Sequence, residues 1–244
     1  MIISENKPIN EILGFLKNAE KVVLIGCNQC AAICKSGGEE EVLKMKEALE
    51  IEGKTVLGYR ILDPACNLLK SKKDLKELKS ELADADAVLS LACGDGTQTI
   101  VKNLKNIPVY PANNTMFIGE TKRIGEFEEA CKACGDCELG WTGGICPVTM
   151  CAKGLINGAC GGAKNGKCEV SQDNDCAWVK IYERLKDIDQ LDNLLEIRPM
   201  KDYSKQNNPR SLNLKENSAQ KVQIPLTAMP QEIKTYHLLK NQII

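Results

Sequence analysis

Apolar and polar residues alternate along the first half of the chain in two patterns. Apolar residues recur at helical spacing in some segments, which predicts amphipathic helices. These segments are 10–16, 37–53, 74–85 and 96–104. Mainly apolar runs of five to nine residues separate them and predict buried strands. These runs are 21–26, 54–62, 87–92 and 107–111.

Strands separated by helical crossovers pair in parallel, with helices packed on both faces of the sheet. We therefore expect residues 1–125 to form an α/β domain. Residues 126–197 have little apolar periodicity apart from a helical stripe at 176–197, and they predict a cysteine-rich domain followed by a helix. Residues 198–244 contain four prolines and no sustained period. They predict an extended tail that is either disordered or bound to a partner.

The composition sets limits on the partners and the compartment. The chain has 32 basic and 33 acidic residues, so its net charge of -1 gives no reason to expect nucleic acid or an anionic membrane as a partner. The N-terminus does not have the pattern of a signal peptide, and no apolar run reaches the length of a membrane span. We therefore expect a cytoplasmic protein.

Cysteine is the exceptional residue of this chain, with 13 copies against one histidine. A reducing cytosol does not maintain a disulfide framework, and an odd number of thiols cannot pair completely within one chain. Metal ligation is therefore the leading explanation. Eight of the cysteines lie between residues 131 and 176, and five lie between residues 27 and 93.

The downstream group begins Cys131-x2-Cys134-x2-Cys137 and continues at Cys146-Pro147. Three thiolates at this spacing can bind three irons of one [4Fe-4S] cluster, and the fourth ligand comes from farther along the chain. The gap before Cys146 has eight residues, where a bacterial ferredoxin has three, so a ferredoxin fold is not implied. Eight thiolates suit two such clusters. The other four members are Cys151, Cys160, Cys168 and Cys176.

Structural zinc is the alternative for the same loops. Zinc also binds sets of four cysteines, which usually come from paired Cys-x2-Cys knuckles. The triple spacing of Cys131, Cys134 and Cys137 departs from that pairing and favours iron and sulfide.

The upstream group follows the predicted strands. Cys27, Cys30 and Cys34 come after the first strand, Cys66 after the second and Cys93 after the third. The carboxyl ends of parallel strands share one edge of the sheet, where α/β folds bind their ligands. We expect a further cluster on Cys27, Cys30, Cys34 and Cys93, with Cys66 as an alternative ligand or a neighbouring free thiol. Ordinary burial of Cys66 and Cys93 is the other explanation.

Five longer stretches carry a further signal. They are GCNQCAAICKSGGEEEV (26–42), LACGDGTQT (91–99), CPVTMCAKGLINGACGG (146–162), NGKCEV (165–170) and DCAWVKIYERL (175–185). The three downstream stretches resemble the cysteine-rich domain associated with bacterial methylene-tetrahydrofolate reductases. Together with the two upstream stretches, the whole pattern is similar to the small iron–sulfur subunit that accompanies the catalytic flavoprotein in acetogenic bacteria, and this likeness extends from about residue 20 to 200. Ala159 stands where this family has proline, which alters the stiffness of the loop without removing a ligand.

The resemblance implies two or three [4Fe-4S] clusters, with zinc as an alternative. It also implies a partner, the flavin-containing catalytic subunit of the reductase in the Wood–Ljungdahl pathway, and a possible further electron-donor protein. The implied ligands are Cys27, Cys30, Cys34, Cys93, Cys131, Cys134, Cys137, Cys146, Cys151, Cys160, Cys168 and Cys176.

Two functions follow from these ligand sets. In the first, the chain transfers electrons to the flavin of the catalytic subunit. In the second, it is a zinc-binding subunit that scaffolds or activates the flavoprotein. Catalysis by the chain itself has little support, because its one histidine, His237, lies in the tail and no catalytic set accompanies the cysteines. We therefore expect a non-catalytic subunit of an oxidoreductase complex.

Overall fold

The structure is a computed structural model that describes residues 1–214. The chain divides into two compact units, Met1–Asp202 and Tyr203–Ile244. In the second unit the described residues include one short 3-10 helix, η3 (Tyr203–Gln206). Most of the tail expected at 198–244, together with His237, lies outside the described residues.

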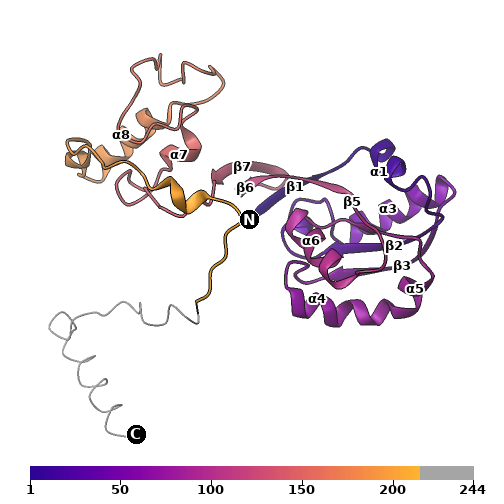
Figure 1. The fold of residues 1–244 in the computed structure, drawn as a ribbon. Coiled ribbons are helices and arrows are strands. Elements are labelled where there is room, and N and C mark those ends of the chain that lie inside the picture. Colours follow the sequence, from indigo (N-terminus) through magenta and orange to yellow (C-terminus); the bar gives the residue numbers. More distant parts are fainter. Residues whose placement is uncertain (215–244) are drawn as a thin grey trace, which may run out of the picture. The chain divides into compact units, whose positions relative to one another are not determined.

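A parallel sheet of four strands forms the centre of the first unit and confirms the predicted α/β fold. Its strand order is β3-β2-β4-β5, and every neighbouring pair is parallel (Figure 1). Each strand coincides with one of the apolar runs of the sequence. The strands are β2 (Lys21–Cys27), β3 (Thr55–Leu62), β4 (Ala87–Ser90) and β5 (Val109–Pro111).

Helices cover both faces of this sheet. Val22 and Leu24 of β2 point to one face, where α1 and α3 supply buried residues. Val23 and Ile25 point to the other face and pack with η1 and α6. Alternate residues of one strand therefore contribute to two cores, as expected for a sheet buried on both sides. The elements of this part are α1 (Ile9–Phe15), α2 (Cys30–Ile33), α3 (Glu39–Ile51), α4 (Leu68–Asp74), η1 (Leu75–Leu78), α5 (Lys79–Asp84) and α6 (Gly94–Asn103).

The helix predicted at 74–85 is divided into η1 and α5, and the preceding helix α4 was not predicted. The two apolar residues at the start of α4, Leu68 and Leu69, are both exposed, so this helix has no apolar stripe that periodicity could reveal. The side-chain oxygen of Asn67 caps it by accepting a hydrogen bond from the Lys70 N–H at 3.0 Å.

A second, antiparallel sheet was also not predicted. It has the strand order β1-β6-β7 and consists of β1 (Ile2–Asn6), β6 (Asn113–Arg123) and β7 (Glu126–Cys131). β6 and β7 are rich in charged and exposed residues, and β1 has only five residues, so none of them has the apolar run that identifies the parallel strands. The boundary expected between residues 125 and 126 falls in the turn that joins β6 to β7, where Gly125 adopts a φ of 81°.

Buried polar groups connect β1 and β6 to the parallel sheet. The Asn6 side-chain amide donates to the Ser36 carbonyl and to Asn113 Oδ1, both at 2.8 Å. The Asn113 amide in turn donates to the carbonyl of Leu91 at 2.7 Å, directly after β4. Asn113, a residue of the antiparallel sheet, therefore provides the hydrogen-bond donor for a backbone carbonyl of the α/β core.

We expect Asn113→Ala to lower the free energy of unfolding by about 1–3 kcal/mol, because the buried Leu91 carbonyl would lose its side-chain donor. Asn114→Ala is the control, since Asn114 is only partly buried and accepts a hydrogen bond from Lys7. Urea unfolding followed by circular dichroism measures both variants. Equal stability of the two would contradict the role assigned to Asn113.

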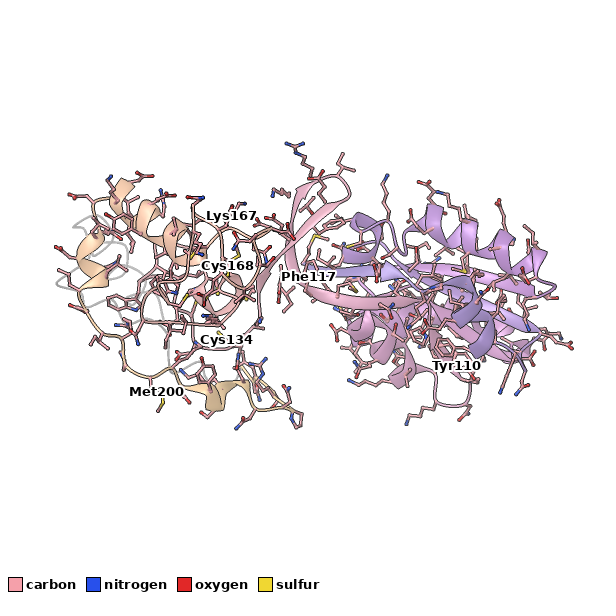
Figure 2. The ribbon with its side chains drawn as sticks, turned by 90° about the horizontal axis from the view of Figure 1, so that it is seen from above. Tyr110, Phe117, Cys134, Lys167, Cys168 and Met200 are labelled. Atoms are coloured by element: carbon pink, nitrogen blue, oxygen red, sulfur yellow. The ribbon has the colours of Figure 1, made fainter. Side chains whose placement is uncertain are left out.

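Loops and tight turns make up most of the cysteine-rich segment, residues 132–176. It contains one short helix, α7 (Pro147–Met150), and Cys134 and Cys168 lie on its loops (Figure 2). Several of its glycines, including Gly135 and Gly154, adopt the left-handed conformation that glycine tolerates best. The backbone of this segment therefore depends on turns rather than on regular ladders.

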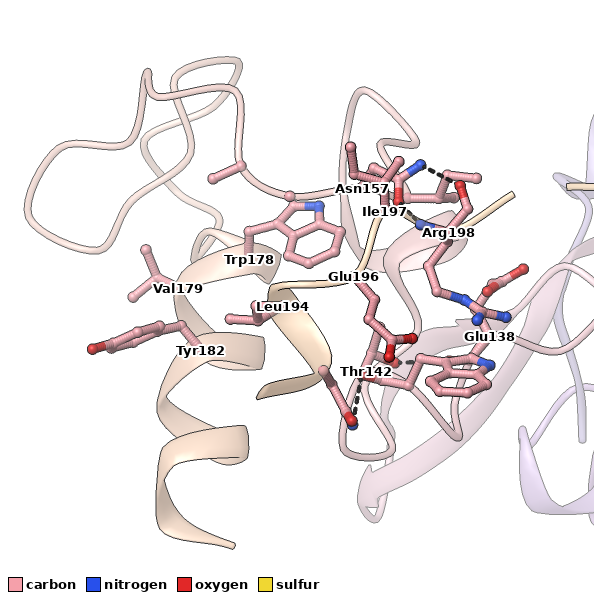
Figure 3. Close-up of a pocket in the computed structure, with 15 residues that line it drawn as sticks. Glu138, Thr142, Asn157, Trp178, Val179, Tyr182, Leu194, Glu196, Ile197 and Arg198 are labelled. Carbon is pink, nitrogen blue, oxygen red and sulfur yellow. Dashed lines mark hydrogen bonds between the residues drawn. The ribbon is translucent and has the colours of Figure 1, made fainter. Parts of the chain in front are cut away.

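The helix expected at 176–197 is shorter in the structure. α8 (Ala177–Asp187) ends before Asp189, which has a φ of 55°, and the 3-10 helix η2 (Leu191–Leu194) follows. Trp178 and Tyr182 project from α8 (Figure 3). The buried core here is small and consists of Trp178, Ile181 and Leu185, with Cys151 and Cys176 packed against it. None of the helices within residues 1–214 is both long and apolar enough to cross a membrane.

Candidate metal centre

Three cysteines follow strands at the carboxyl edge of the parallel sheet. Cys27 ends β2, Cys66 lies in the turn after β3, and Cys93 is the residue before α6. The negative charges of the Cys27 and Cys93 thiolates both raise the pKa of Cys66, so the three thiols lie near enough to influence one another. The structure thus places one cysteine at each of three strand ends on the same edge of the sheet.

The electrostatics of this upstream group favour a cation. Cys93 is buried, whereas Cys66 is exposed and so is not the ordinary buried cysteine that was the other explanation. Partial desolvation of its thiol is still the largest cause that raises the pKa of Cys66, followed by the carboxylate of Asp95. Burial also raises the pKa of Cys93, although the N–H groups of Gly96 and Asp95 at the start of α6 partly oppose it. Three thiols and a carboxylate therefore repel one another when ionised, and a bound cation would relieve that repulsion.

Cys30 and Cys34 lie together at a different place, against β1. The Ile2 N–H donates to Cys30 Sγ at 3.5 Å, and Cys34 Sγ contacts the Ile2 carbonyl at 3.8 Å. These two cysteines stand one helical turn apart and share one backbone neighbour. The charges of Cys27 and Cys93 act on Cys66, whereas the hydrogen bonds of Cys30 and Cys34 are with the backbone of Ile2. The alternative in which Cys66 is a ligand therefore stays open beside the set Cys27, Cys30, Cys34 and Cys93.

The downstream group starts at the end of β7. Cys131 is the last residue of that strand, and its Sγ accepts a hydrogen bond from the Ala133 N–H at 3.2 Å. Ala133 and Gly135 have left-handed φ values of 49° and 79°, which turn the backbone tightly between the cysteines. Backbone N–H groups that point at sulfur stabilise thiolates and tune the metals they bind.

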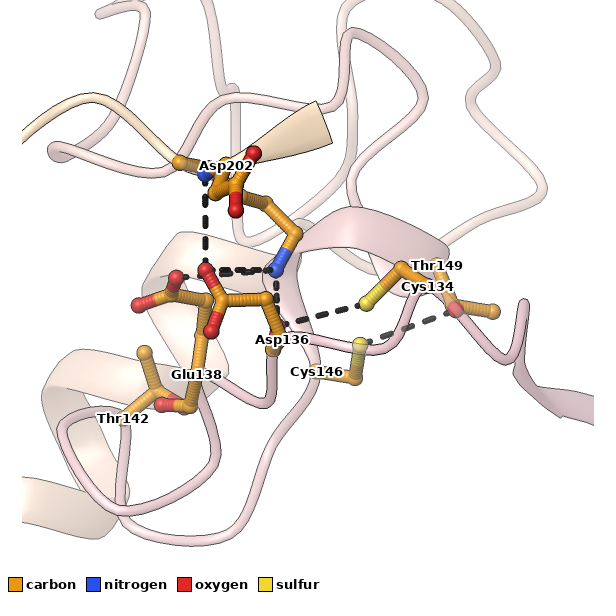
Figure 4. Close-up of polar contacts among 8 residues, drawn as sticks. Cys134, Asp136, Glu138, Thr142, Cys146, Thr149 and Asp202 are labelled. Atoms are coloured by element: carbon orange, nitrogen blue, oxygen red, sulfur yellow. Dashed lines mark hydrogen bonds and ion pairs between the residues drawn. The ribbon is translucent and has the colours of Figure 1, made fainter. Parts of the chain in front are cut away.

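A buried lysine lies beside this loop. The Lys201 side chain is fully buried, and its amine donates to the Asp136 carbonyl, which also accepts from Cys134 Sγ at 3.3 Å. It also lies 3.9 Å from Asp136 Oδ2 and 3.7 Å from Glu138 Oε1. Figure 4 shows Cys134, Asp136 and Glu138 gathered in this network.

Burial alone would lower the pKa of Lys201. The hydrogen bond to Cys134 and the charges of Cys134, Asp136 and Glu138 outweigh burial, so the pKa of Lys201 is raised. A positive charge is therefore held next to the first cysteine loop. The sequence does not predict that Lys201 lies beside the cysteines, because no regular spacing connects it to them.

Cys160 has a comparable environment. The Gly162 N–H is the largest cause that lowers the pKa of Cys160, and Lys153 lowers it further. Lys153 is held by an ion pair with Glu169. Among the other downstream cysteines, Cys146 Sγ lies 3.6 Å from Thr149 Oγ1.

The downstream sulfurs differ in exposure. Cys131, Cys137 and Cys160 are exposed, and the other five are partly buried. In the part of the chain that the structure describes, no three Cys, His, Asp or Glu side chains are already arranged at metal-binding distances. Metal binding by either group therefore requires some thiols to reorient.

The donor chemistry fits a metal held by thiolates. Thiols dominate both groups, and backbone N–H groups or lysines face Cys93, Cys131, Cys134 and Cys160. Such donors offset the negative charge that several thiolates bring to one centre. Both iron–sulfur clusters and zinc meet this description.

Comparison with known proteins relates one part of the chain to a family. Residues 110–204 match the family model described as methylene-tetrahydrofolate reductase C terminal. All eight downstream cysteines and Lys201 lie in the matched region, whereas the upstream cysteines precede it. No curated protein and no solved structure matches the chain.

Proposed function

We propose that the chain is the small iron–sulfur subunit, of the MetV type, of a methylene-tetrahydrofolate reductase complex. In this role it delivers electrons to the flavin of the catalytic subunit. The observation that carries the proposal is the position of the eight downstream cysteines, which all fall within the region similar to a reductase domain. When bound, [4Fe-4S] clusters would supply one-electron carriers whose potentials depend on their surroundings.

The residues of the downstream segment have separate tasks in this proposal. Its eight cysteines would hold the metal, and the N–H groups of Ala133 and Gly162 would donate to ligand sulfurs. Lys153 and Lys201 would place positive charge beside Cys160 and Cys134. A cluster whose thiolate ligands lie beside N–H donors and lysines would be easier to reduce than a cluster surrounded only by negative charge.

The upstream cysteines would form a further centre at the sheet edge. Cys27, Cys66 and Cys93 would be its ligands because they share one edge of the sheet and their charges influence one another, and Cys30 or Cys34 would complete the set after a change of side-chain orientation. Carboxyl edges of parallel sheets are the usual ligand sites of α/β folds.

A zinc-binding scaffold subunit is the second candidate. Asp95 interacts with both Cys66 and Cys93, so the upstream group includes an oxygen donor as well as thiols. Zinc accepts cysteine together with aspartate, whereas iron–sulfur clusters are mostly bound by cysteine alone. In this case the chain would assemble or activate the flavoprotein without carrying electrons.

A mixing experiment separates the two candidates. The full chain is purified without oxygen, reduced with dithionite, freed of excess reductant and mixed with the oxidised flavoprotein subunit. We expect the absorbance of oxidised flavin to fall, and metal-free chain to leave it unchanged. A stable complex of the two proteins in which the flavin stays oxidised would refute electron delivery and support the scaffold.

Cys66→Ser tests the upstream ligand set. We expect this variant to lose as much metal per chain as Cys93→Ser, because both thiols would bind the same centre. The double variant should lose no more than either single variant, since changes within one site are not additive. Elemental analysis of the purified proteins measures this, and full metal content in Cys66→Ser would exclude Cys66 as a ligand.

A further inference from the structure

A pocket of about 390 Å³ lies in the cysteine-rich part of the chain and takes no part in the proposed metal binding. Four segments line it: residues 138–142, residues 156–159, α8 and residues 193–198 (Figure 3). Its wall is mostly apolar and includes Trp141, Trp178 and Tyr182. Small-molecule sites have this size and lining, with a few polar groups that fix the ligand. We call it the Trp141 pocket.

Hydrogen bonds hold the walls of the Trp141 pocket. The Asn157 side chain accepts from the Arg198 N–H at 2.7 Å and donates to the Arg198 carbonyl at 3.1 Å. Trp178 Nε1 donates to the Leu155 carbonyl at 3.0 Å. The backbone of Arg198 and the ring of Trp178 are therefore fixed before any ligand binds.

Arg198 is the residue that indicates what the pocket binds. The centre of its guanidinium lies 3.7 Å from the centroid of the Trp141 ring, so the two groups are stacked. Its Nε is buried and has no hydrogen-bond partner among the described residues. A buried donor without a partner is costly, and a ligand that accepts its hydrogen bond would remove that cost.

The nearby carboxylates leave this guanidinium available. Glu138 also lines the pocket, but its carboxylate lies 3.7 Å from the buried amine of Lys201. Glu196 is the other acid of the lining, and its side chain is exposed. An anion in the pocket would thus be attracted by Arg198 and weakly repelled by Glu196.

We propose that the Trp141 pocket binds a small planar aromatic anion. The ring lies against the aromatic side chains, and its carboxylate, sulfonate or phosphate accepts hydrogen bonds from Arg198. Tryptophan and tyrosine favour stacking with flat rings, and arginine matches carboxylate and phosphate geometry. An apolar side chain of a protein partner would fill the same space but leave the Arg198 donor unpaired, so the small anion is favoured.

Two probes of equal shape test the proposal on the full chain. 2-Naphthoate carries the anion, and 2-naphthamide has the same ring without the charge. Titration calorimetry should give a dissociation constant about tenfold lower for naphthoate, the effect of one charge-assisted hydrogen bond. Arg198→Gln should remove this preference, and Glu196→Gln should tighten naphthoate binding without changing naphthamide binding.

Arg123→Gln is the control, because Arg123 is exposed at the end of β6, outside the pocket lining. Arg123→Gln should still bind 2-naphthoate more tightly than 2-naphthamide. Equal binding of the two probes to the unmodified chain would overturn the proposal and indicate a site for apolar side chains. Preference for naphthoate that persists in Arg198→Gln would also overturn it. The effect of Glu196→Gln provides an independent test if Arg198→Gln does not fold.

Discussion

Cys134→Ala removes about one cluster's worth of iron and acid-labile sulfide from the anaerobically purified chain. Cys134 is the middle member of the triple Cys131, Cys134, Cys137, and its thiol and the amine of Lys201 both donate to the carbonyl of Asp136. Three closely spaced thiolates bind three irons of one cluster, so the loss of one ligand compromises the whole centre. Delivery of electrons to the flavoprotein should fall with the iron content.

Lys132→Ala is the matched control for this variant. Lys132 lies in the same loop, is exposed and carries no sulfur. It should retain the full content of iron and sulfide. If Cys134→Ala retains as much iron as Lys132→Ala, Cys134 is not a ligand and the assignment of the triple fails.

The second large effect concerns Lys201. We expect Lys201→Met to lower the free energy of unfolding by about 3 kcal/mol or more, because it leaves Asp136 and Glu138 without their buried cation. Methionine fills a similar volume, so the loss reports the charge and its hydrogen bonds rather than a cavity. Urea unfolding of the metal-loaded full chain measures the change.

Lys153→Met provides the comparison. Lys153 also pairs with an acid, Glu169, but its side chain is 40% exposed, and exposed pairs contribute about 0–1 kcal/mol. Limited proteolysis should show earlier cleavage of residues 131–138 in Lys201→Met than in Lys153→Met. If Lys201→Met and Lys153→Met are equally stable, the pairing of Lys201 with Asp136 and Glu138 does not stabilise the cysteine loop.

The parallel sheet could be predicted from sequence because its strands are buried on both faces. Such strands appear as continuous apolar runs, as in residues 21–26, where every residue from Val22 onward is buried. β6 and β7 lack this signal, since most of their side chains are charged or exposed. The length of the last helix was overestimated because apolar residues continue after Asp187, whereas the backbone changes direction at Asp189.

Part of the candidate metal site was also predictable from the sequence, namely the cysteines at the ends of the parallel strands. Strand ends determine where Cys27, Cys66 and Cys93 emerge, so their place at one edge of the sheet follows from the order of elements. The contacts of Cys30 and Cys34 with Ile2 depend on how the short helix α2 packs against β1, and local sequence does not specify that packing. Lys201 reaches Cys134 from a distant part of the chain and leaves no pattern that spacing could reveal.

Binding of iron and sulfide by the downstream cysteines is tested most directly by quantification of iron, zinc and acid-labile sulfide in the full chain purified without oxygen. We expect iron and sulfide in equal amounts, with a loss confined to one cluster in Cys134→Ala. Stoichiometric zinc without acid-labile sulfide would contradict binding of iron and sulfide.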